Sequence, residues 1–184
     1  MLHVNFDPFP ILTTQRLILR QINLGDANEI YFLRSDEEML KYVGRPKAKS
    51  IQEAIEWIEM INNFIKNNEG VTWAITLKDN PLLIGNIGFW KLEKEHYRTQ
   101  VGYVLHPDHH KKGIMDEALK AVLHYGFYTL KFHSIEANID PANAASKRLL
   151  ERNGFIREAY YKENYFFEGK FIDSAIYSLL TPVK

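Results

Sequence analysis

The sequence predicts an α+β (mixed α/β) fold, in which helices flank a mostly antiparallel sheet. Three segments of strand-like composition, at 71–77, 82–90 and 99–105, are separated only by short polar turns, which is typical of an antiparallel meander. Two longer segments, at 51–65 and 113–130, carry apolar residues at helical spacing instead. The meander and these two amphipathic segments together indicate a sheet with helices packed against it.

The N-terminal third supplies the elements that lead into the meander. The alternating pattern at 16–22 predicts a strand, and the segment 24–35 that follows predicts a helix. Ser50 and Glu53 have the spacing of a capping box, so we expect them to begin the helix at 51–65.

The C-terminal half predicts a helix, a strand, a second helix and a hairpin. The helix at 113–130 has a wide apolar surface, so we expect it to be covered on two sides. A strand follows at 133–139, and the next helix ends at Gly154, a residue suited to a left-handed C-terminal cap. The segment 155–180 predicts a hairpin that turns at 168–170.

Length, charge and cysteine content narrow the class of protein. No linker interrupts the 184 residues, so we expect one domain over residues 1–184 with its core at about 13–180. Lys plus Arg equals Asp plus Glu at 23 each, which argues against a nucleic-acid partner held by bulk charge. The absence of cysteine excludes disulfides, zinc–thiolate sites and a cysteine nucleophile. No segment has transmembrane length or the layout of a signal peptide, so we expect a cytoplasmic protein without membrane contact.

One turn has the composition of an anion site. "VGYVLHPDHHKKGIMDEALK" leaves a strand through a polar turn and starts a helix beside Gly113, with Lys111 and Lys112 adjacent. A helix N-terminus presents free N–H groups to an anion, although an ordinary polar turn can also begin a helix. The turn lacks the spacing of a P-loop or a dinucleotide fingerprint. His109 and His110 have no suitably spaced third ligand, so we expect no metal.

Two motifs resemble those of a known family. "HPDHHKKGIMDEALKAVLHYGF", followed by "HSIEANIDPANAASKRLLERNGF", resembles the GCN5-related N-acetyltransferases (GNAT), in particular the RimJ/RimL-like enzymes that acetylate ribosomal-protein N-termini. "LTTQRLILRQI" and "GKFIDSAIYSLL" fit the same branch, so the resemblance covers about 13–180. It implies a twisted sheet that splits into a V between the strands at 101–105 and 134–139, with acetyl-CoA in the split.

The resemblance also implies how acetyl-CoA is held. Backbone groups of the first of these strands pair with the pantetheine arm, N–H groups before the long helix hold the pyrophosphate, and two polar residues of the next helix approach the thiol. The family's loop pattern is Q/R-x-x-G-x-G/A, of which only Gly113 keeps its place here. The residues assigned to the cofactor are Tyr103, Val104, Leu105, His110, Lys111, Lys112, Gly113, Ile114, Met115, Asn138, Asn143 and Ser146.

The resemblance implies a direct transfer without an acyl-enzyme or a metal, through a tetrahedral intermediate held by a backbone N–H near Leu105. Ser146 is expected to donate to the departing thiolate, since Leu150 stands where other branches have a tyrosine. Gln100 stands where many relatives carry a glutamate base, and glutamine cannot take a proton. His96, four residues earlier, is an alternative base, against the simpler reading of a solvated histidine.

The acceptor is open between two classes of amine. An α-amino group is roughly one-tenth neutral at pH 7, whereas a lysine is neutral only about 0.04% of the time. A site without a strong base therefore favours a protein N-terminus, as on a ribosomal protein. A small amine such as an amino acid or polyamine is the first alternative, and a catalytically weak CoA-binding module is the second. A binding domain without a CoA site is a weaker third, and the resemblance also allows a homodimer.

Overall fold

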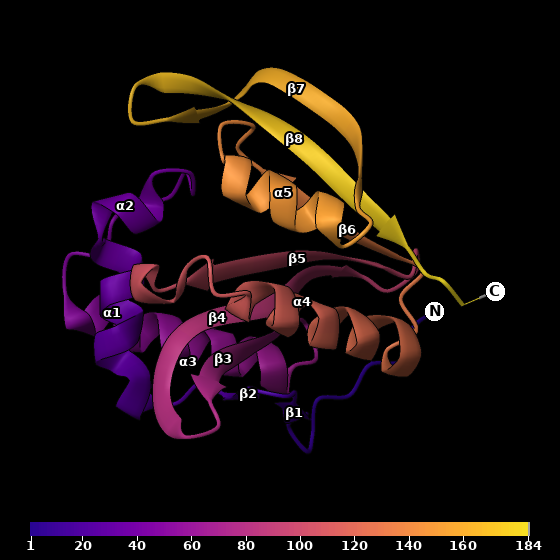
Figure 1. Cartoon of the computed structure of the whole chain (residues 1–184), viewed down its shortest axis with the longest axis horizontal. Coiled ribbons are helices and arrows are strands. Elements are labelled where there is room, and N and C mark those ends of the chain that lie inside the picture. Colours follow the sequence, from indigo (N-terminus) through magenta and orange to yellow (C-terminus); the bar gives the residue numbers. More distant parts are fainter. Residues whose placement is uncertain (184) are drawn as a thin grey trace.

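The computed structural model describes residues 1–183 and shows one eight-stranded sheet with helices on both faces (Figure 1). The strand order is β1-β2-β3-β4-β5-β6-β8-β7, and every neighbouring pair is antiparallel except β5 with β6. This confirms the predicted mostly antiparallel sheet with flanking helices. The strands are β1 Leu12–Thr13, β2 Leu17–Gln21, β3 Val71–Leu77, β4 Asn80–Glu93, β5 Arg98–Leu105, β6 Ser134–Ile139, β7 Ile156–Phe167 and β8 Lys170–Leu180.

The helices alternate with these strands along the chain. They are α1 Ala27–Ser35, α2 Glu37–Leu40, α3 Ile51–Lys66, α4 Ile114–His124 and α5 Ala144–Arg152. Short 3-10 turns at Leu24–Asp26 and Pro107–His109 precede α1 and α4. Within the described part of the chain, no helix is both long enough and apolar enough to cross a membrane.

The expected capping box of α3 forms only in part. The Ser50 hydroxyl accepts from the Glu53 N–H at 3.3 Å, as predicted. The Glu53 carboxylate, however, accepts from the N–H of Lys49 rather than that of Ser50. The predicted reciprocal bond is therefore wrong, because the carboxylate reaches one residue further back along the chain.

The helix predicted at 113–130 is α-helical over only part of that range. Its α-helical part ends at His124 and continues as a π-helical turn, Tyr125–Thr129. Gly126 lies in that turn, where a Cβ atom would meet the Phe89 ring at 2.8 Å. The turn brings the helix backbone close to the sheet, which apolar spacing alone does not indicate.

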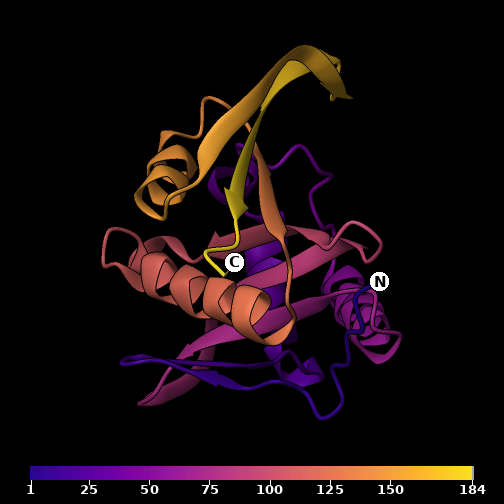
Figure 2. The same cartoon turned by 90° about the vertical axis from the view of Figure 1, so that its right-hand side faces the viewer.

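The sheet separates two apolar cores. α4 packs on one face, and α1 and α3 pack on the other, against the cluster around Ile30, Leu33 and Ile58. In Figure 2, α4 and α5 lie to the left of the sheet and α3 lies to its right. Side chains alternate along β5, so Leu105 joins the α4 core while Val104 packs against the α1–α3 core.

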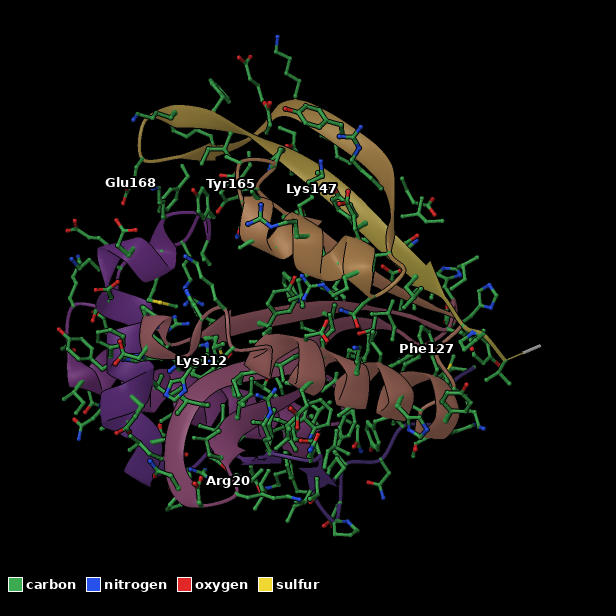
Figure 3. All side chains as sticks on the ribbon, in the orientation of Figure 1. Arg20, Lys112, Phe127, Lys147, Tyr165 and Glu168 are labelled. Atoms are coloured by element: carbon green, nitrogen blue, oxygen red, sulfur yellow. The ribbon has the colours of Figure 1, made fainter. Side chains whose placement is uncertain are left out.

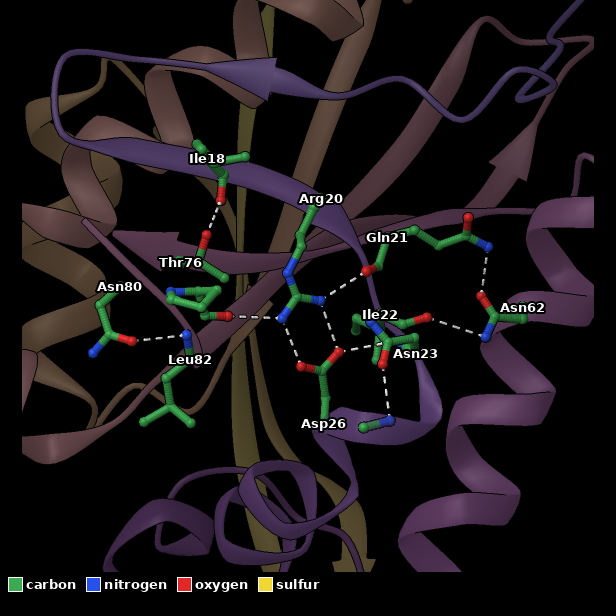
Figure 4. Close-up of polar contacts among 12 residues, drawn as sticks. Ile18, Arg20, Gln21, Ile22, Asn23, Asp26, Asn62, Thr76, Asn80 and Leu82 are labelled. Carbon is green, nitrogen blue, oxygen red and sulfur yellow. Dashed lines mark hydrogen bonds and ion pairs between the residues drawn. The ribbon is translucent and has the colours of Figure 1, made fainter. Parts of the chain in front are cut away.

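A buried ion pair ties the end of β2 to the start of α1 (Figure 4). The Arg20 guanidinium donates to both Asp26 oxygens, at 2.8 and 2.6 Å, and to the carbonyls of Gln21 and Pro81. Asp26 is 5% exposed, and its carboxylate also accepts from the N–H of Asn23. Arg20 is thus a half-buried arginine that is paired within the protein, and its pKa is raised, chiefly by the bond to Asp26.

Candidate active site

β5 and β6 separate after a short paired segment. They pair only between Arg98–Gln100 and Ser134–Glu136. Beyond that point, 101–105 keeps only its outer neighbour β4, and 137–139 keeps only β8. Figure 1 shows the two strands diverging from their paired end. The separation leaves unpaired backbone groups on two inner strand edges, to which an extended ligand can add as a strand.

The N-terminus of α4 opens beside this split. Gly113 is its N-cap residue, at φ 73°, and no side chain caps the first turn. Its first amide groups are therefore available to an anion. The acidic residues of that turn are bound elsewhere: Asp116 accepts from Lys120 and Asn153, and Glu117 accepts from Arg16. The helix end thus suits a phosphate through its backbone, and the binding of an anion there stays a prediction.

The chain before β2 holds this helix start in place. The Glu117 carboxylate accepts from the Thr14 hydroxyl at 2.5 Å and from the Arg16 Nε at 2.6 Å. Arg16 also donates through Nη1 to the carbonyl of Lys112, at 3.0 Å. Burial alone would raise the pKa of Glu117, but the bonds from Thr14 and Arg16 outweigh it and lower the pKa below its ordinary value. These contacts hold the turn between β1 and β2 against the loop that leads into α4.

Side chains of the loop face in different directions. Lys111 and Lys112 are exposed, and Figure 3 labels Lys112 in the loop that leads into α4. Ile114 is buried and Met115 packs against the α4 core, so these two offer only backbone groups to a ligand. His110 donates through Nε2 to the carbonyl of Leu105, at 2.7 Å, which fastens the loop to the end of β5.

A hydrogen bond links the two sides of the split. The Tyr103 hydroxyl on β5 lies 2.7 Å from the Ser146 hydroxyl on α5. Asn143 is the N-cap residue of α5. Its Oδ1 accepts from the Ser146 N–H at 3.0 Å and thereby positions Ser146. Burial raises the pKa of Tyr103 to about 12, so the phenol stays protonated at neutral pH. We expected only the backbone of Tyr103 to take part, and the alternation along β5 could have pointed to its side chain.

A second polar group, formed by Arg98, Gln100 and Glu136, lies where β5 and β6 pair, on the face of the sheet opposite Tyr103. Gln100 donates through Nε2 to the Glu136 carboxylate at 2.7 Å, and Arg98 donates to the same carboxylate at 2.6 Å. The Gln100 Oε1 is buried and has no partner among the described residues. Glu136 lies directly opposite Gln100 in the β5–β6 register, a pairing that spacing along the chain does not reveal.

Two of the predicted residues lie apart from these groups. His96 is exposed in the turn between β4 and β5, at the closed end of the split. Its role as a base stays a prediction to which the contacts add no support. Asn138 is exposed on β6, beyond the last β5–β6 pair. Val104 offers only its backbone to the split, because its side chain packs against the α1–α3 core.

This geometry is that of a protein that binds an extended, anionic ligand between two separated strands and at a helix N-terminus. A family model described as an acetyltransferase (GNAT) domain matches residues 16–156. The chain is 37% identical over 174 residues to YoaA of Bacillus subtilis (strain 168), an uncharacterized N-acetyltransferase, covering 95% of this chain and 98% of that one. The crystal structure of a GNAT-family acetyltransferase from Bacillus anthracis has a TM-score of 0.82 at 27% identity, covering 93% and 98% of the two chains. The chain belongs to the GNAT family and is an acetyl-CoA-dependent N-acetyltransferase.

Relatives of known acceptor differ from one another. The [ribosomal protein uS5]-alanine N-acetyltransferase of Escherichia coli (strain K12) is 30% identical over 176 residues, covering 93% of this chain and 91% of that one. The spermidine N(1)-acetyltransferase of Vibrio cholerae is 24% identical over 158 residues, covering 86% and 89%. Family membership therefore establishes the donor and the reaction type and leaves the acceptor open.

Proposed function

We propose that the acceptor is the α-amine of a protein N-terminus, of the ribosomal-protein type. The observation that carries this proposal is Gln100, an amide bound to Glu136 at the point where β5 and β6 separate. An amide cannot take a proton, so the site favours an amine that is already partly neutral at pH 7, which an α-amine is and a lysine is not. The uS5-alanine N-acetyltransferase among the relatives supports the same acceptor.

In this proposal acetyl-CoA is held mainly by backbone groups. Its pyrophosphate is bound by the free amides at the start of α4, where Gly113 allows close approach. Its pantetheine arm pairs with the free inner edge of β5 at 101–105. His110 supports this arrangement indirectly, because its bond to the Leu105 carbonyl sets the loop against the end of the strand.

The residues of the split then have separate roles. The acceptor nitrogen forms a bond to the acetyl carbon to give a tetrahedral intermediate, the carbon–sulfur bond then breaks, and the proton lost by the amine ends on the thiol of CoA. Gln100 accepts a hydrogen bond from the amine through its free Oε1 and orients it. In this hydrogen-bonded pair of hydroxyls, Tyr103 donates to Ser146, and the Ser146 O–H donates to the sulfur. Tyr103 acts as a neutral donor because burial keeps its pKa near 12.

An acceptor screen tests the proposal. Peptides with a free N-terminal alanine or serine are incubated with acetyl-CoA and the full chain, and the products are located by mass spectrometry. The same peptides with a blocked α-amine and one internal lysine are the matched controls. We expect acetylation of the free N-termini only. Acetylation confined to internal lysines would contradict the proposal.

A polyamine is the second candidate, because a spermidine acetyltransferase lies among the relatives. Spermidine in the same screen separates the two acceptors. A kcat/KM for spermidine above that of every peptide would replace the N-terminal assignment and leave the acetyl-CoA site in place.

A further inference from the structure

Three buried side-chain polar atoms lack a hydrogen-bond partner among residues 1–183, and all lie on the side of the sheet away from α4. They are the Nε atoms of Arg34 and Arg45 and the Oε1 of Gln100. Buried polar groups are normally paired, so each unpaired atom needs an explanation. Two of these atoms are cationic donors, on α1 and on the chain between α2 and α3, and one is a neutral acceptor on β5.

Arg34 lies near enough for its charge to act on Arg45, and neither arginine forms an ion pair with a carboxylate, although the charge of Glu53 acts on Arg34 and opposes the lowering of its pKa by burial. Arg34 is in the last turn of α1, and its guanidinium lies 4.9 Å from the ring centre of Trp57 on α3. Arg45 follows α2, and no ion pair within the described chain includes either side chain. Burial, and then the nearby charge of Arg34, lower the pKa of Arg45 to about 10. An unpaired charge in such surroundings is unfavourable until an anion neutralises it.

Arg20 provides the contrast within the same molecule. Its guanidinium binds both oxygens of Asp26 and two backbone carbonyls, as expected of an arginine that stabilises the fold. The Nε atoms of Arg34 and Arg45 have no hydrogen-bond partner among the described residues, although both side chains are partly buried. Their arrangement is that of a binding site more than that of a structural ion pair.

The two arginines lie where the half of the sheet that contains β3 and β4 meets the half that contains β6 to β8. α1 and α3 pack on the side that contains β3 and β4. Gly44, next to Arg45, accepts through its carbonyl from the Tyr165 hydroxyl of the β7–β8 hairpin at 2.6 Å, and that hairpin belongs to the side that contains β6. Figure 3 labels Tyr165 on this hairpin, and Figure 1 shows α2 and the chain after it below the hairpin, at the open end of the split.

We infer that the acceptor carries a carboxylate as well as its amine, and that Arg34 and Arg45 bind this carboxylate while Gln100 accepts from the amine. The inference rests on the proposed function, since it describes the same acceptor site. The groups assigned to acetyl-CoA are the free edge of β5, the start of α4 and Ser146 of α5, none of which lies on α1 or α3, so we assign the arginines to the second substrate. A polyamine, which has no anionic group, does not satisfy this pair.

Matched peptides test the carboxylate directly. Two peptides that differ only in Asp or Asn near a free N-terminus are compared by kcat/KM, with a free amino acid as a third acceptor to show whether the carboxylate belongs to a side chain or to the α-carbon. A charged hydrogen-bonded contact corresponds to roughly a tenfold or greater preference for Asp. We expect Arg45→Gln to abolish this preference through KM while the Kd for acetyl-CoA is unchanged. Arg157→Gln, which removes an exposed charge from β7, should keep it.

An activity-independent measurement separates this inference from the proposed function. Succinate should raise the Tm of the wild type, whereas succinamide, which has no carboxylate, should not. Succinate should also leave the Tm of the double variant R34Q/R45Q unchanged. Without ligand, the double variant should keep or exceed the wild-type Tm, whereas Arg20→Gln should lower it. If no peptide is acetylated, the proposed function fails, and the response to succinate alone decides the inference.

The carboxylate site is overturned by any of three results. The first is equal use of the Asp and Asn peptides by the wild type together with no stabilisation by succinate. The second is a loss of acetyl-CoA affinity in Arg45→Gln, which would place the arginine in the donor site. The third is a fall in the ligand-free Tm of the double variant to that of Arg20→Gln, which would make the pair structural.

Discussion

The hydrogen bond between Tyr103 and Ser146 gives a prediction whose size follows from burial. Ser146→Ala leaves the buried Tyr103 hydroxyl without a partner, and Tyr103→Phe does the same to Ser146, which is 7% exposed. Each single change should cost about 1–3 kcal/mol of unfolding free energy, because an orphaned buried group costs more than a lost bond. The double variant orphans neither hydroxyl, so its cost should be about 1 kcal/mol, well below the sum.

Urea unfolding of the four proteins measures this coupling, provided that the slope of unfolding with urea is the same in each. Ser174 supplies the control, since it is also 7% exposed but bonds to Asn164 in the hairpin. Tyr103→Phe combined with Ser174→Ala should be additive. The coupling to Ser146 should also persist from neutral to mildly alkaline pH, because Tyr103 has a pKa of about 12. Additive costs for Tyr103 and Ser146 would show that no bond joins the two sides of the split.

Two further predictions concern carboxylates around the split. Glu117→Gln should lower the unfolding free energy at pH 7 by about 1–3 kcal/mol, because it weakens the bonds from Thr14 and Arg16. The pKa of Glu117 is lowered from 4.5 in the folded protein, so the wild-type advantage should hold above that pH and disappear as pH falls through the folded value, in paired thermal unfolding scans. Gln100→Glu places a second carboxylate against Glu136, which raises the folded pKa of the pair and should cost about 1 kcal/mol or more at pH 7. Its stability should return to that of the wild type in acid, and a deficit independent of pH would contradict the contact.

Local patterns predicted most of the elements because each depends on neighbours in sequence. Strand-like composition predicted β3 with its observed bounds of Val71–Leu77, and the position of Gly154 after α5 matches its φ of 85°. The π-helical turn escaped prediction because it depends on the close approach of Gly126 to the Phe89 ring of β4, a contact between residues far apart in sequence.

The candidate site was predictable only where backbone groups compose it. The helix start at Gly113 follows from a local motif, whereas the separation of β5 from β6 follows from strand pairing and was expected only through the family resemblance. The contact between Gln100 and Glu136 depends on register between two strands. The proximity of Arg34 to Arg45 depends on how α1, α2 and α3 pack, and neither residue stands in a recognisable motif, so the sequence did not indicate it.

Calorimetric titration with acetyl-CoA tests the assigned donor site most directly. The wild type is compared with Gly113→Pro, which removes an N–H and cannot adopt the observed φ of 73°. Gly169→Pro is the matched control, because Gly169 has a similar φ of 78° in the hairpin turn between β7 and β8. We predict tight binding by the wild type and by Gly169→Pro, and loss of binding in Gly113→Pro. Equal binding by all three proteins would contradict the placement of the donor's pyrophosphate at the start of α4.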